Sequence, residues 1–128
     1  MANLAVVTAL GDDSFSDAMC QSWAAENIGL GMVQRLAGRL PGLYCIQTDA
    51  NGERRFRYWR NEAAVRDCFT TPAAEPILAA LPDYDVLYFS GITLAVLGAM
   101  VALAASPAWM ASVAGKVALA CAARSGSN

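Results

Sequence analysis

The sequence predicts an α/β fold into which a β-hairpin is inserted. Two continuous apolar runs, Leu4–Leu10 and Val86–Ile92, favour strands that are buried on both faces of a parallel sheet. The hairpin is predicted by two aromatic and branched segments, Gly42–Asp49 and Arg54–Arg60, which flank the turn signal Asn51-Gly52. Helical patterns separate these strand-like segments, as is typical of α/β proteins.

A helix is predicted directly after the first strand. Gly11–Ser14 reads as a turn, in which Asp13 or Ser14 can serve as the N-cap of that helix. The pair Asp12 and Asp13 also fits a catalytic carboxylate dyad, but beside a helix start we favour capping. Apolar residues then recur at helical spacing through about Glu26: Phe15, Met19 and Trp23.

The remaining elements follow from apolar periodicity and from the positions of glycine and proline. Strands are predicted at Met32–Ala37 and Lys116–Ala120. Helices are predicted at Glu62–Phe69, at Ala73–Ala80 and, with Thr93 as a cap, at Thr93–Ala105. The alanine- and serine-rich segment 98–128 differs in composition from residues 1–97, so we expect one partial domain followed by a divergent tail.

The basic residues are concentrated in one region of an otherwise acidic chain. The net charge is −2, which argues against a general nucleic-acid binder. Seven of the nine basic residues lie in the middle of the chain, and all seven are arginine: Arg35, Arg39, Arg54, Arg55, Arg57, Arg60 and Arg66. Arginine suits the recognition of a carboxylate or phosphate, although a solvated hairpin face is the simpler alternative.

Cysteine and histidine usage excludes several kinds of site. The chain has four cysteines and no histidine, so histidine-based nucleophile pairs and metal sites are excluded. The cysteines match no zinc pattern and include no Cys-x-x-Cys motif. We expect reduced, mostly buried thiols in a cytoplasmic protein, and we expect no metal site.

An uncharged stretch raises the alternative of a membrane protein. Val86–Gly115 holds 30 consecutive residues without a charged side chain, and a window of ~20 can cross a bilayer. A strand that ends at Gly91, followed by the interruption at Ser106-Pro107, favours a protein without a membrane span.

Three segments together resemble the 2-keto-3-deoxygluconate kinase subfamily of the ribokinase/PfkB sugar kinases. They are VTALGDDSF (Val7–Phe15), RLPGLYCIQTDANGERRFRYWRNEAA (Arg39–Ala64) and YDVLYFSGITLAVL (Tyr84–Leu97). The resemblance implies a ribokinase-like doubly wound domain with a small β-sheet lid that closes over a sugar. The predicted hairpin, at about residues 32–61, would be part of that lid.

The resemblance also implies a reaction and a set of substrate contacts. Such kinases transfer the γ-phosphate of ATP, with Mg²⁺, to the 6-hydroxyl of the sugar acid 2-keto-3-deoxygluconate. Tyr44, Tyr58 and Arg60 match residues that contact this substrate, whereas Arg57 stands where the subfamily often has a tyrosine. The two tyrosines have a structural alternative, because Tyr44 can pair with Tyr58 across the hairpin. Trp59 points to the other face and is expected in a core or an interface. Asn61 and Glu62 are alternative caps of the next helix.

Other parts of the subfamily pattern are not found in the sequence. The sugar-binding Gly-Gly-Asp segment and the Gly-Ala-Gly-Asp motif, which supplies the catalytic base and a phosphate cradle, do not occur. We therefore expect neither an ATP·Mg²⁺ site nor kinase activity in this chain alone. After Gly115-Lys116-Val117 the sequence departs from the subfamily, which suggests a disrupted reading frame. A non-catalytic sugar-acid-binding or interaction module is the alternative, and a homodimer through the lid sheet is the oligomer that the resemblance implies.

Overall fold

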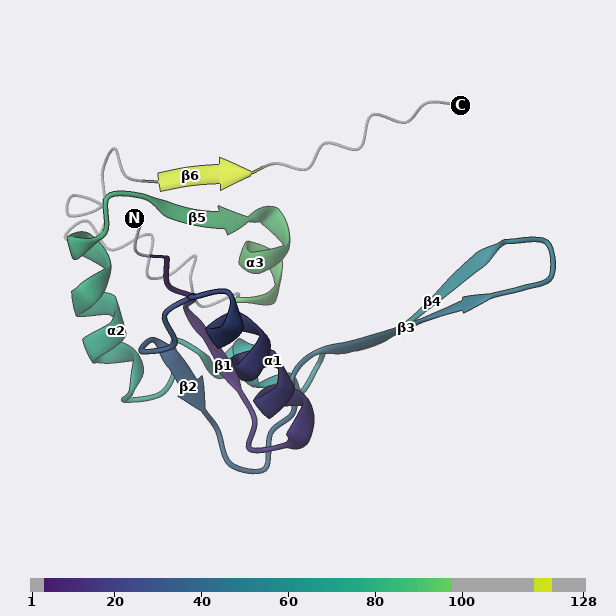
Figure 1. Cartoon of the computed structure of the whole chain (residues 1–128), viewed down its shortest axis with the longest axis horizontal. Coiled ribbons are helices and arrows are strands. Elements are labelled where there is room, and N and C mark those ends of the chain that lie inside the picture. The colour runs from purple at the N-terminus through teal and green to yellow at the C-terminus, as the bar shows by residue number, and fades with distance from the viewer. Residues whose placement is uncertain (1–3, 98–116, 121–128) are drawn as a thin grey trace. The chain divides into compact units, whose positions relative to one another are not determined.

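The computed structural model describes residues 4–97 and 117–120. The chain divides into two compact units, residues 1–68 and 69–128. Among the described residues the strands form three two-stranded sheets, of which two are parallel and one is antiparallel. Helices connect the strands of each parallel pair, and the antiparallel pair is a hairpin (Figure 1). The predicted α/β class with an inserted hairpin is therefore confirmed.

The first unit begins with a β-α-β segment. Strand β1 (Thr8–Leu10) pairs in parallel with β2 (Val33–Arg35), and α1 (Ser14–Ala25) lies between them in the sequence. The first strand is shorter than predicted, because before Thr8 only an isolated bridge joins Ala5 to Gly29. The strand predicted at Met32–Ala37 is likewise reduced to β2.

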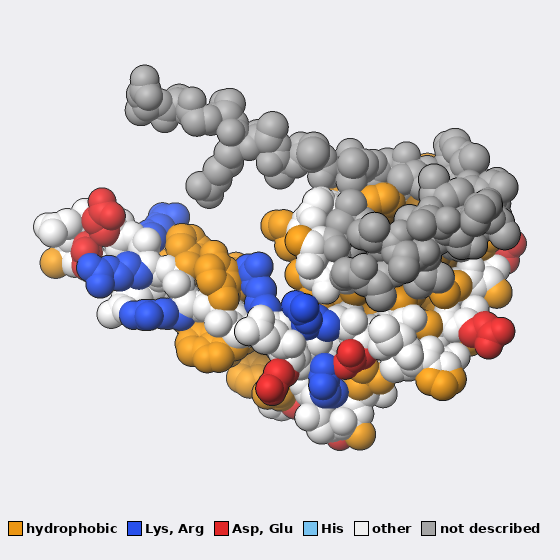
Figure 2. Space-filling model, turned by 180° about the vertical axis from the view of Figure 1, so that it is seen from behind, with side chains coloured by type: hydrophobic (Ala, Val, Ile, Leu, Met, Phe, Trp, Pro, Cys, Tyr) orange, Lys and Arg blue, Asp and Glu red, His pale blue; other side chains and the backbone are white. Residues whose placement is uncertain are grey.

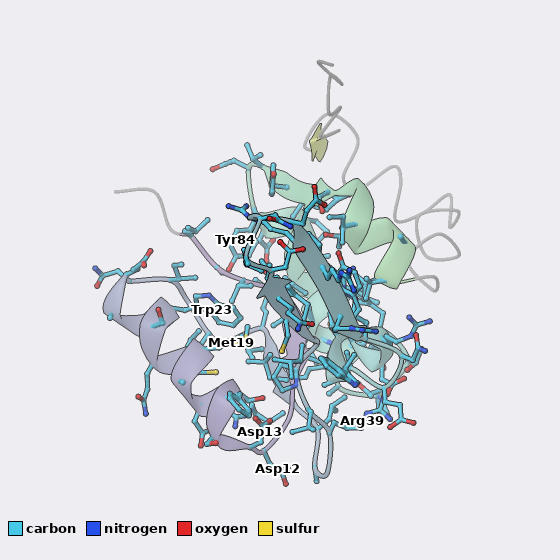
Figure 3. All side chains as sticks on the ribbon, turned by 90° about the vertical axis from the view of Figure 1, so that its right-hand side faces the viewer. Asp12, Asp13, Met19, Trp23, Arg39 and Tyr84 are labelled. Carbon is cyan, nitrogen blue, oxygen red and sulfur yellow. The ribbon has the colours of Figure 1, made fainter. Side chains whose placement is uncertain are left out.

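Helix α1 begins where the sequence predicts, and Asp13 rather than Ser14 is its N-cap. The Asp13 Oδ1 atom accepts hydrogen bonds from the backbone N–H groups of Phe15 at 2.9 Å and Ser16 at 3.1 Å. The Asp12 carboxylate instead accepts the backbone N–H of Gly38 at 3.0 Å. Both acids lie at the start of α1 (Figure 3), and each accepts backbone N–H groups, Asp13 as the helix cap and Asp12 from Gly38. These structural roles support capping over a catalytic dyad.

The apolar stripe of α1 is not part of the core. Phe15 is 64% exposed and Met19 is 37% exposed, although both recur at helical spacing as predicted. The core of this unit is instead made by small and medium side chains of β1, of the segment around β2, and of η1 (Ala64–Asp67). Its buried hydrophobic residues are Ala9, Leu10, Met32, Ala63, Ala64 and Cys68.

The hairpin consists of β3 (Leu43–Thr48) and β4 (Arg54–Trp59). It is narrower than the predicted range of about 32–61, because Val33–Arg35 pairs with β1 instead of joining the hairpin. All twelve strand residues are exposed, and the ribbon projects from the β1, α1 and β2 segment of the same unit (Figure 1).

The turn between β3 and β4 depends on Asp49 and Gly52. The Asp49 carboxylate accepts the backbone N–H groups of Asn51 at 2.9 Å and Glu53 at 3.0 Å. Gly52 has a φ of 83°, in the left-handed region that a three-residue hairpin loop requires at this position. The Asn-Gly signal therefore predicts the correct turn.

The second unit contains another parallel strand pair. Strand β5 (Leu87–Ser90) pairs with β6 (Val117–Ala120), with Leu87 opposite Val117. Before β5 the chain forms α2 (Ala74–Ala80) and the short 3₁₀ helix η2 (Leu81–Asp83). The helix predicted at Ala73–Ala80 and the strand predicted at Lys116–Ala120 agree with α2 and β6 within one residue. Strand β5 is shorter than the predicted Val86–Ile92, and Tyr88 is 72% exposed, so the expectation of a strand buried on both faces was wrong there.

Helix α3 (Gly91–Val96) follows β5 and has an N-terminus different from the predicted one. Ser90, not Thr93, is its N-cap, and Thr93 is the third helical residue of a reciprocal capping box. The prediction was wrong by three residues, nearly one helical turn, because serine and threonine carry the same capping signal. The predicted continuation to Ala105 lies outside the described residues.

In the described ranges, no helix combines the length and the apolar character needed to cross a bilayer. The uncharged stretch Val86–Gly115 is described only up to residue 97, and that part contains β5 and α3. The described cysteines are free thiols, but only Cys68 is buried. Cys45 is exposed because it lies on the hairpin, so the expectation of mostly buried thiols was wrong for it.

Candidate functional site

One face of the hairpin carries aromatic side chains. In the antiparallel register Tyr44 lies opposite Tyr58 and Ile46 lies opposite Phe56, so these four residues share a face. The ring centres of Tyr44 and Tyr58 are 6.2 Å apart, and those of Phe56 and Tyr58 are 6.0 Å apart. Both tyrosines are 54% exposed, so their rings are available to a ligand. Figure 2 shows hydrophobic side chains along the hairpin with arginine side chains around them.

Arg60 belongs to the same face, two residues beyond Tyr58. Its guanidinium carbon lies 4.2 Å from the centre of the Tyr58 ring, in a cation–π contact. Within residues 4–97 and 117–120, no carboxylate lies within ion-pair distance of Arg60. The guanidinium is therefore held by an aromatic ring while its N–H donors stay available to an anion.

Arg57 is separated from these three residues. It lies opposite Cys45, on the other face of the ribbon from Tyr44 and Tyr58. Trp59 is on that other face too and is 58% exposed, so it does not belong to a core, and its place in an interface stays a prediction. The structure thus brings together Tyr44, Tyr58 and Arg60 and leaves Arg57 apart.

An open groove of about 720 Å³ lies at the base of the hairpin, where β3 and β4 join the rest of the unit. Tyr58 and Arg60 line it, but Tyr44 does not. Its other polar side chains are Arg39, Asn61 and Glu62. The remaining lining residues are Gly38, Leu40, Pro41, Leu43, Trp59 and Ala63.

Sequence reasoning did not assign Arg39 to the site, although Arg39 opens the RLPGLY segment within the arginine cluster. Its Nη2 atom forms an ion pair with Asp67 Oδ2 at 2.5 Å. Its Nε atom is buried and has no hydrogen-bond acceptor among the described residues. Arg39 therefore differs from Arg60: its charge is already neutralised, by a residue of η1.

Backbone contacts fix the groove's position in the unit. Ala64 donates its N–H to the Leu40 carbonyl at 2.9 Å, which joins the two chain segments that lead into and out of the hairpin. The Arg39 carbonyl packs on Gly11 so closely that a Cβ atom there would lie 1.7 Å from its oxygen. Glycine is therefore required at position 11 for the β1–α1 loop to contact the groove segment.

Arg35 is a second arginine with a structural role. Its Nε atom donates to the Gly11 carbonyl at 2.6 Å, and its Nη2 atom contacts Asp17 Oδ1 at 2.5 Å. The hydrogen bond to Asp17 raises the pKa of Arg35. Arg35 therefore stabilises the β1–α1 loop through the Gly11 carbonyl, and it does not line the groove.

The described residues do not form a recognisable metal centre. Across ranges 4–97 and 117–120 there is no group of three or more aspartate, glutamate, cysteine or histidine side chains that could hold a metal ion.

Comparisons with known proteins identify the family. Residues 1–127 match the model of the pfkB family of carbohydrate kinases. The chain is 53% identical over 91 residues to the 2-dehydro-3-deoxygluconokinase of Dickeya dadantii (strain 3937), which covers 71% of this chain and 29% of that protein. It is 50% identical over 91 residues to the 2-dehydro-3-deoxygluconokinase of Escherichia coli (strain K12), with the same coverage of 71% and 29%.

The fold is also found among solved structures. The crystal structure of the PfkB protein from Polaromonas sp. JS666 superposes with a TM-score of 0.69 at 19% identity. The match covers 91% of this chain and 39% of that protein. The chain spans 29% of the length of the curated relatives named above. The family match over residues 1–127 and the shared fold show that this chain belongs to the pfkB family of carbohydrate kinases.

Proposed function

We propose that the hairpin is the lid of a sugar-acid kinase, and that this chain supplies the residues that grip 2-dehydro-3-deoxygluconate. The observation that carries the proposal is the placement of Tyr44, Tyr58 and Arg60 on one exposed hairpin face. The curated relatives at 50% and 53% identity, both named 2-dehydro-3-deoxygluconokinase, support this choice of substrate.

The chemistry of the face suits a sugar acid. A guanidinium presents paired N–H donors that match the two oxygens of a carboxylate, and Arg60 has no competing carboxylate among the described residues. The Tyr58 ring beneath Arg60 limits the orientations of the guanidinium, so less freedom is lost when an anion binds. Tyrosine hydroxyls can exchange hydrogen bonds with the hydroxyls of the sugar, and the ring faces can cover its C–H groups.

Arg57 is the weakest member of the proposed set. It lies on the opposite face of the ribbon, so a ligand held by Tyr58 and Arg60 does not meet it within one hairpin. We therefore assign the binding of the sugar acid to Tyr44, Tyr58 and Arg60, and we use Arg57 as the control position.

The proposed reaction is transfer of the ATP γ-phosphate, with Mg²⁺, to a hydroxyl of the sugar acid. The catalytic aspartate of such kinases lies in a Gly-Ala-Gly-Asp motif that does not occur in these 128 residues. We therefore expect turnover to require residues beyond them. A coupled assay of ADP release from the 128-residue chain tests this expectation: no release supports it, and steady turnover contradicts it. The free thiols of Cys20, Cys45 and Cys68 are compatible with the cytoplasm, where we place this reaction.

Titration calorimetry tests directly whether the chain binds the sugar acid. The purified chain is titrated with 2-dehydro-3-deoxygluconate, with and without ATP, and with D-glucose as a sugar that lacks the carboxylate. The proposal predicts saturable binding of the sugar acid and none of glucose at the same concentration. Equal binding of both sugars, or of neither, contradicts it.

Pairing of two copies through their hairpins is a second candidate function. It is favoured by the exposed aromatic and aliphatic face, where Ile46 is 48% exposed and Phe56 is 45% exposed. Analytical ultracentrifugation of the wild type and of Phe56→Lys tests it. A dimer that the substitution dissociates supports pairing, whereas a wild-type monomer at all concentrations contradicts it.

A further inference from the structure

Three consecutive residues after β4 bring different chemical groups to the groove at the base of the hairpin. Arg60 supplies a cation, Asn61 an amide and Glu62 a carboxylate, and all three line the groove. Arg60 and the tyrosines account for holding an acidic group, but they do not explain why an acidic side chain lies beside them.

Neither Asn61 nor Glu62 has a local structural role in the described part of the chain. The sequence suggests that they cap the following helix, but η1 begins after Ala63 and has no side-chain cap. Both residues are exposed, and their side chains make no hydrogen bond or ion pair with any residue in ranges 4–97 and 117–120. Their polar groups are therefore free to meet a ligand.

The charge balance of the groove is unusual for an anion site. Arg39 is paired with Asp67, so Arg60 is the one lining arginine that lacks a carboxylate partner among the described residues. Glu62 sets a negative charge in the same groove. Arg60 can pair with one negative group of a ligand, and the Glu62 carboxylate repels further negative charge placed beside it.

We propose that Glu62 is a specificity-determining residue, which makes the groove select singly charged sugar acids over phosphorylated ones. This inference rests on the proposed function, because it takes Arg60 as the carboxylate contact. The Glu62 carboxylate accepts hydrogen bonds from ligand hydroxyls, and the Asn61 amide can both donate and accept. A phosphate group on the ligand replaces such a hydroxyl, which removes a hydrogen-bond donor, and it adds negative charge that Glu62 repels. A phosphorylated sugar acid should therefore bind more weakly.

The test compares two sugar acids that differ by a phosphate, D-gluconate and 6-phospho-D-gluconate. Their dissociation constants are measured by titration calorimetry on the full 128-residue chain, at constant low ionic strength. The variant is Glu62→Gln, and the matched control is Glu53→Gln, which removes the same charge in the hairpin turn, away from the groove lining. We expect the wild type to prefer gluconate, and Glu62→Gln to reduce that preference about fivefold or more. Glu53→Gln should leave the preference unchanged.

Two further measurements keep the inference testable if Glu62→Gln does not fold. Glu62→Asp keeps the charge and should keep the preference, and added salt should narrow the wild-type preference because it screens repulsion. The inference is overturned if the preference for gluconate over 6-phosphogluconate is independent of salt, or if it is equal in the Glu62→Gln and Glu53→Gln variants. Gluconate binding that depends on Arg60 would still leave the proposed function intact in that case. Failure of the wild type to bind either gluconate overturns this inference, whereas failure to bind 2-dehydro-3-deoxygluconate is what overturns the proposed function.

Discussion

The Arg60 guanidinium lies over the ring of Tyr58, 4.2 Å from its centre, on the same exposed face of the hairpin as Tyr44. This contact orients a cation at the base of an otherwise projecting ribbon. The ribbon can present that cation only if its turn, its base and the neighbouring loop hold their shape.

The hairpin turn depends on glycine at position 52. Gly52 has a φ of 83°, where an L-residue costs roughly 1–2 kcal/mol. We expect Gly52→Ala to open the hairpin and to speed tryptic cleavage after Arg54 and Arg55, followed by mass spectrometry. Gly31→Ala is the control, because no neighbouring atom lies within 4 Å of the added Cβ. Equal cleavage rates in the two variants would contradict this account of the turn.

The contact between the β1–α1 loop and the groove segment depends on Gly11. A Cβ atom at this position would lie 1.7 Å from the Arg39 carbonyl oxygen and 2.6 Å from Asp13 Oδ2. We expect Gly11→Ala to lower the free energy of unfolding by about 1–3 kcal/mol or more, measured by urea denaturation. Gly29→Ala, whose nearest contact would be an ordinary 3.4 Å, should cost much less. If Gly11→Ala unfolds at the same urea concentration as the wild type, the β1–α1 loop does not pack on Arg39.

The start of α1 should lose stability in acid. A hydrogen bond from the Ser16 side chain lowers the pKa of Asp13, and burial opposes this only in part. Because the folded-state pKa is below the unfolded value of ~3.9, the contribution is complete above that value and is lost as the pH falls through the folded-state pKa.

Two substitutions at Asp13 separate capping from titration. Thermal melts of Asp13→Ala should show lower stability at neutral pH and a flatter acid dependence. Asp13→Asn keeps a good cap without a titrating group, so it should flatten the acid dependence with little loss at neutral pH. An unchanged acid dependence in both variants would mean that Asp13 does not contribute this effect.

The thiols should differ widely in reactivity. Burial raises the pKa of Cys68 to about 11, whereas Cys45 is exposed on the hairpin. We expect iodoacetamide to alkylate Cys45 on the order of 100-fold faster than Cys68 near pH 8, because the thiolate is the reactive form. Peptide mapping measures the two rates separately, and Cys45→Ser should remove the fast labelling of the hairpin peptide. Rapid labelling of Cys68 without denaturant would contradict its burial.

The sequence predicts the features that short-range signals determine. The hairpin follows from alternating aromatic residues around Asn51-Gly52, and the start of α1 follows from the capping preference of aspartate. By contrast, helical spacing shows that Phe15 and Met19 share one side of α1 but does not show whether another element covers them. Both are exposed, so the spacing predicts the helix but not a buried face.

The site was predicted only in part, for the same physical reason. Tyr58 lies in β4 and Arg60 follows two residues later, one residue beyond the strand, so the alternation of strand residues alone suggests that they share a face. Arg39 acts through Asp67, 28 residues away, and through a backbone contact with Gly11. Such long-range contacts leave no local pattern, so sequence reasoning alone could not separate a paired arginine from an available one.

The most direct test of the central claim compares Arg60→Ala with Arg57→Ala in the binding of 2-dehydro-3-deoxygluconate, measured by titration calorimetry. The two substitutions remove the same side chain from opposite faces of the hairpin, because Arg57 faces away from Tyr58 and Arg60 lies over its ring. A lost charged hydrogen bond is worth about 1.5–3 kcal/mol, so Arg60→Ala should weaken binding about tenfold or more, with Arg57→Ala near wild type. Equal losses in both variants, or full affinity in Arg60→Ala, would contradict the claim that Arg60 holds the sugar acid.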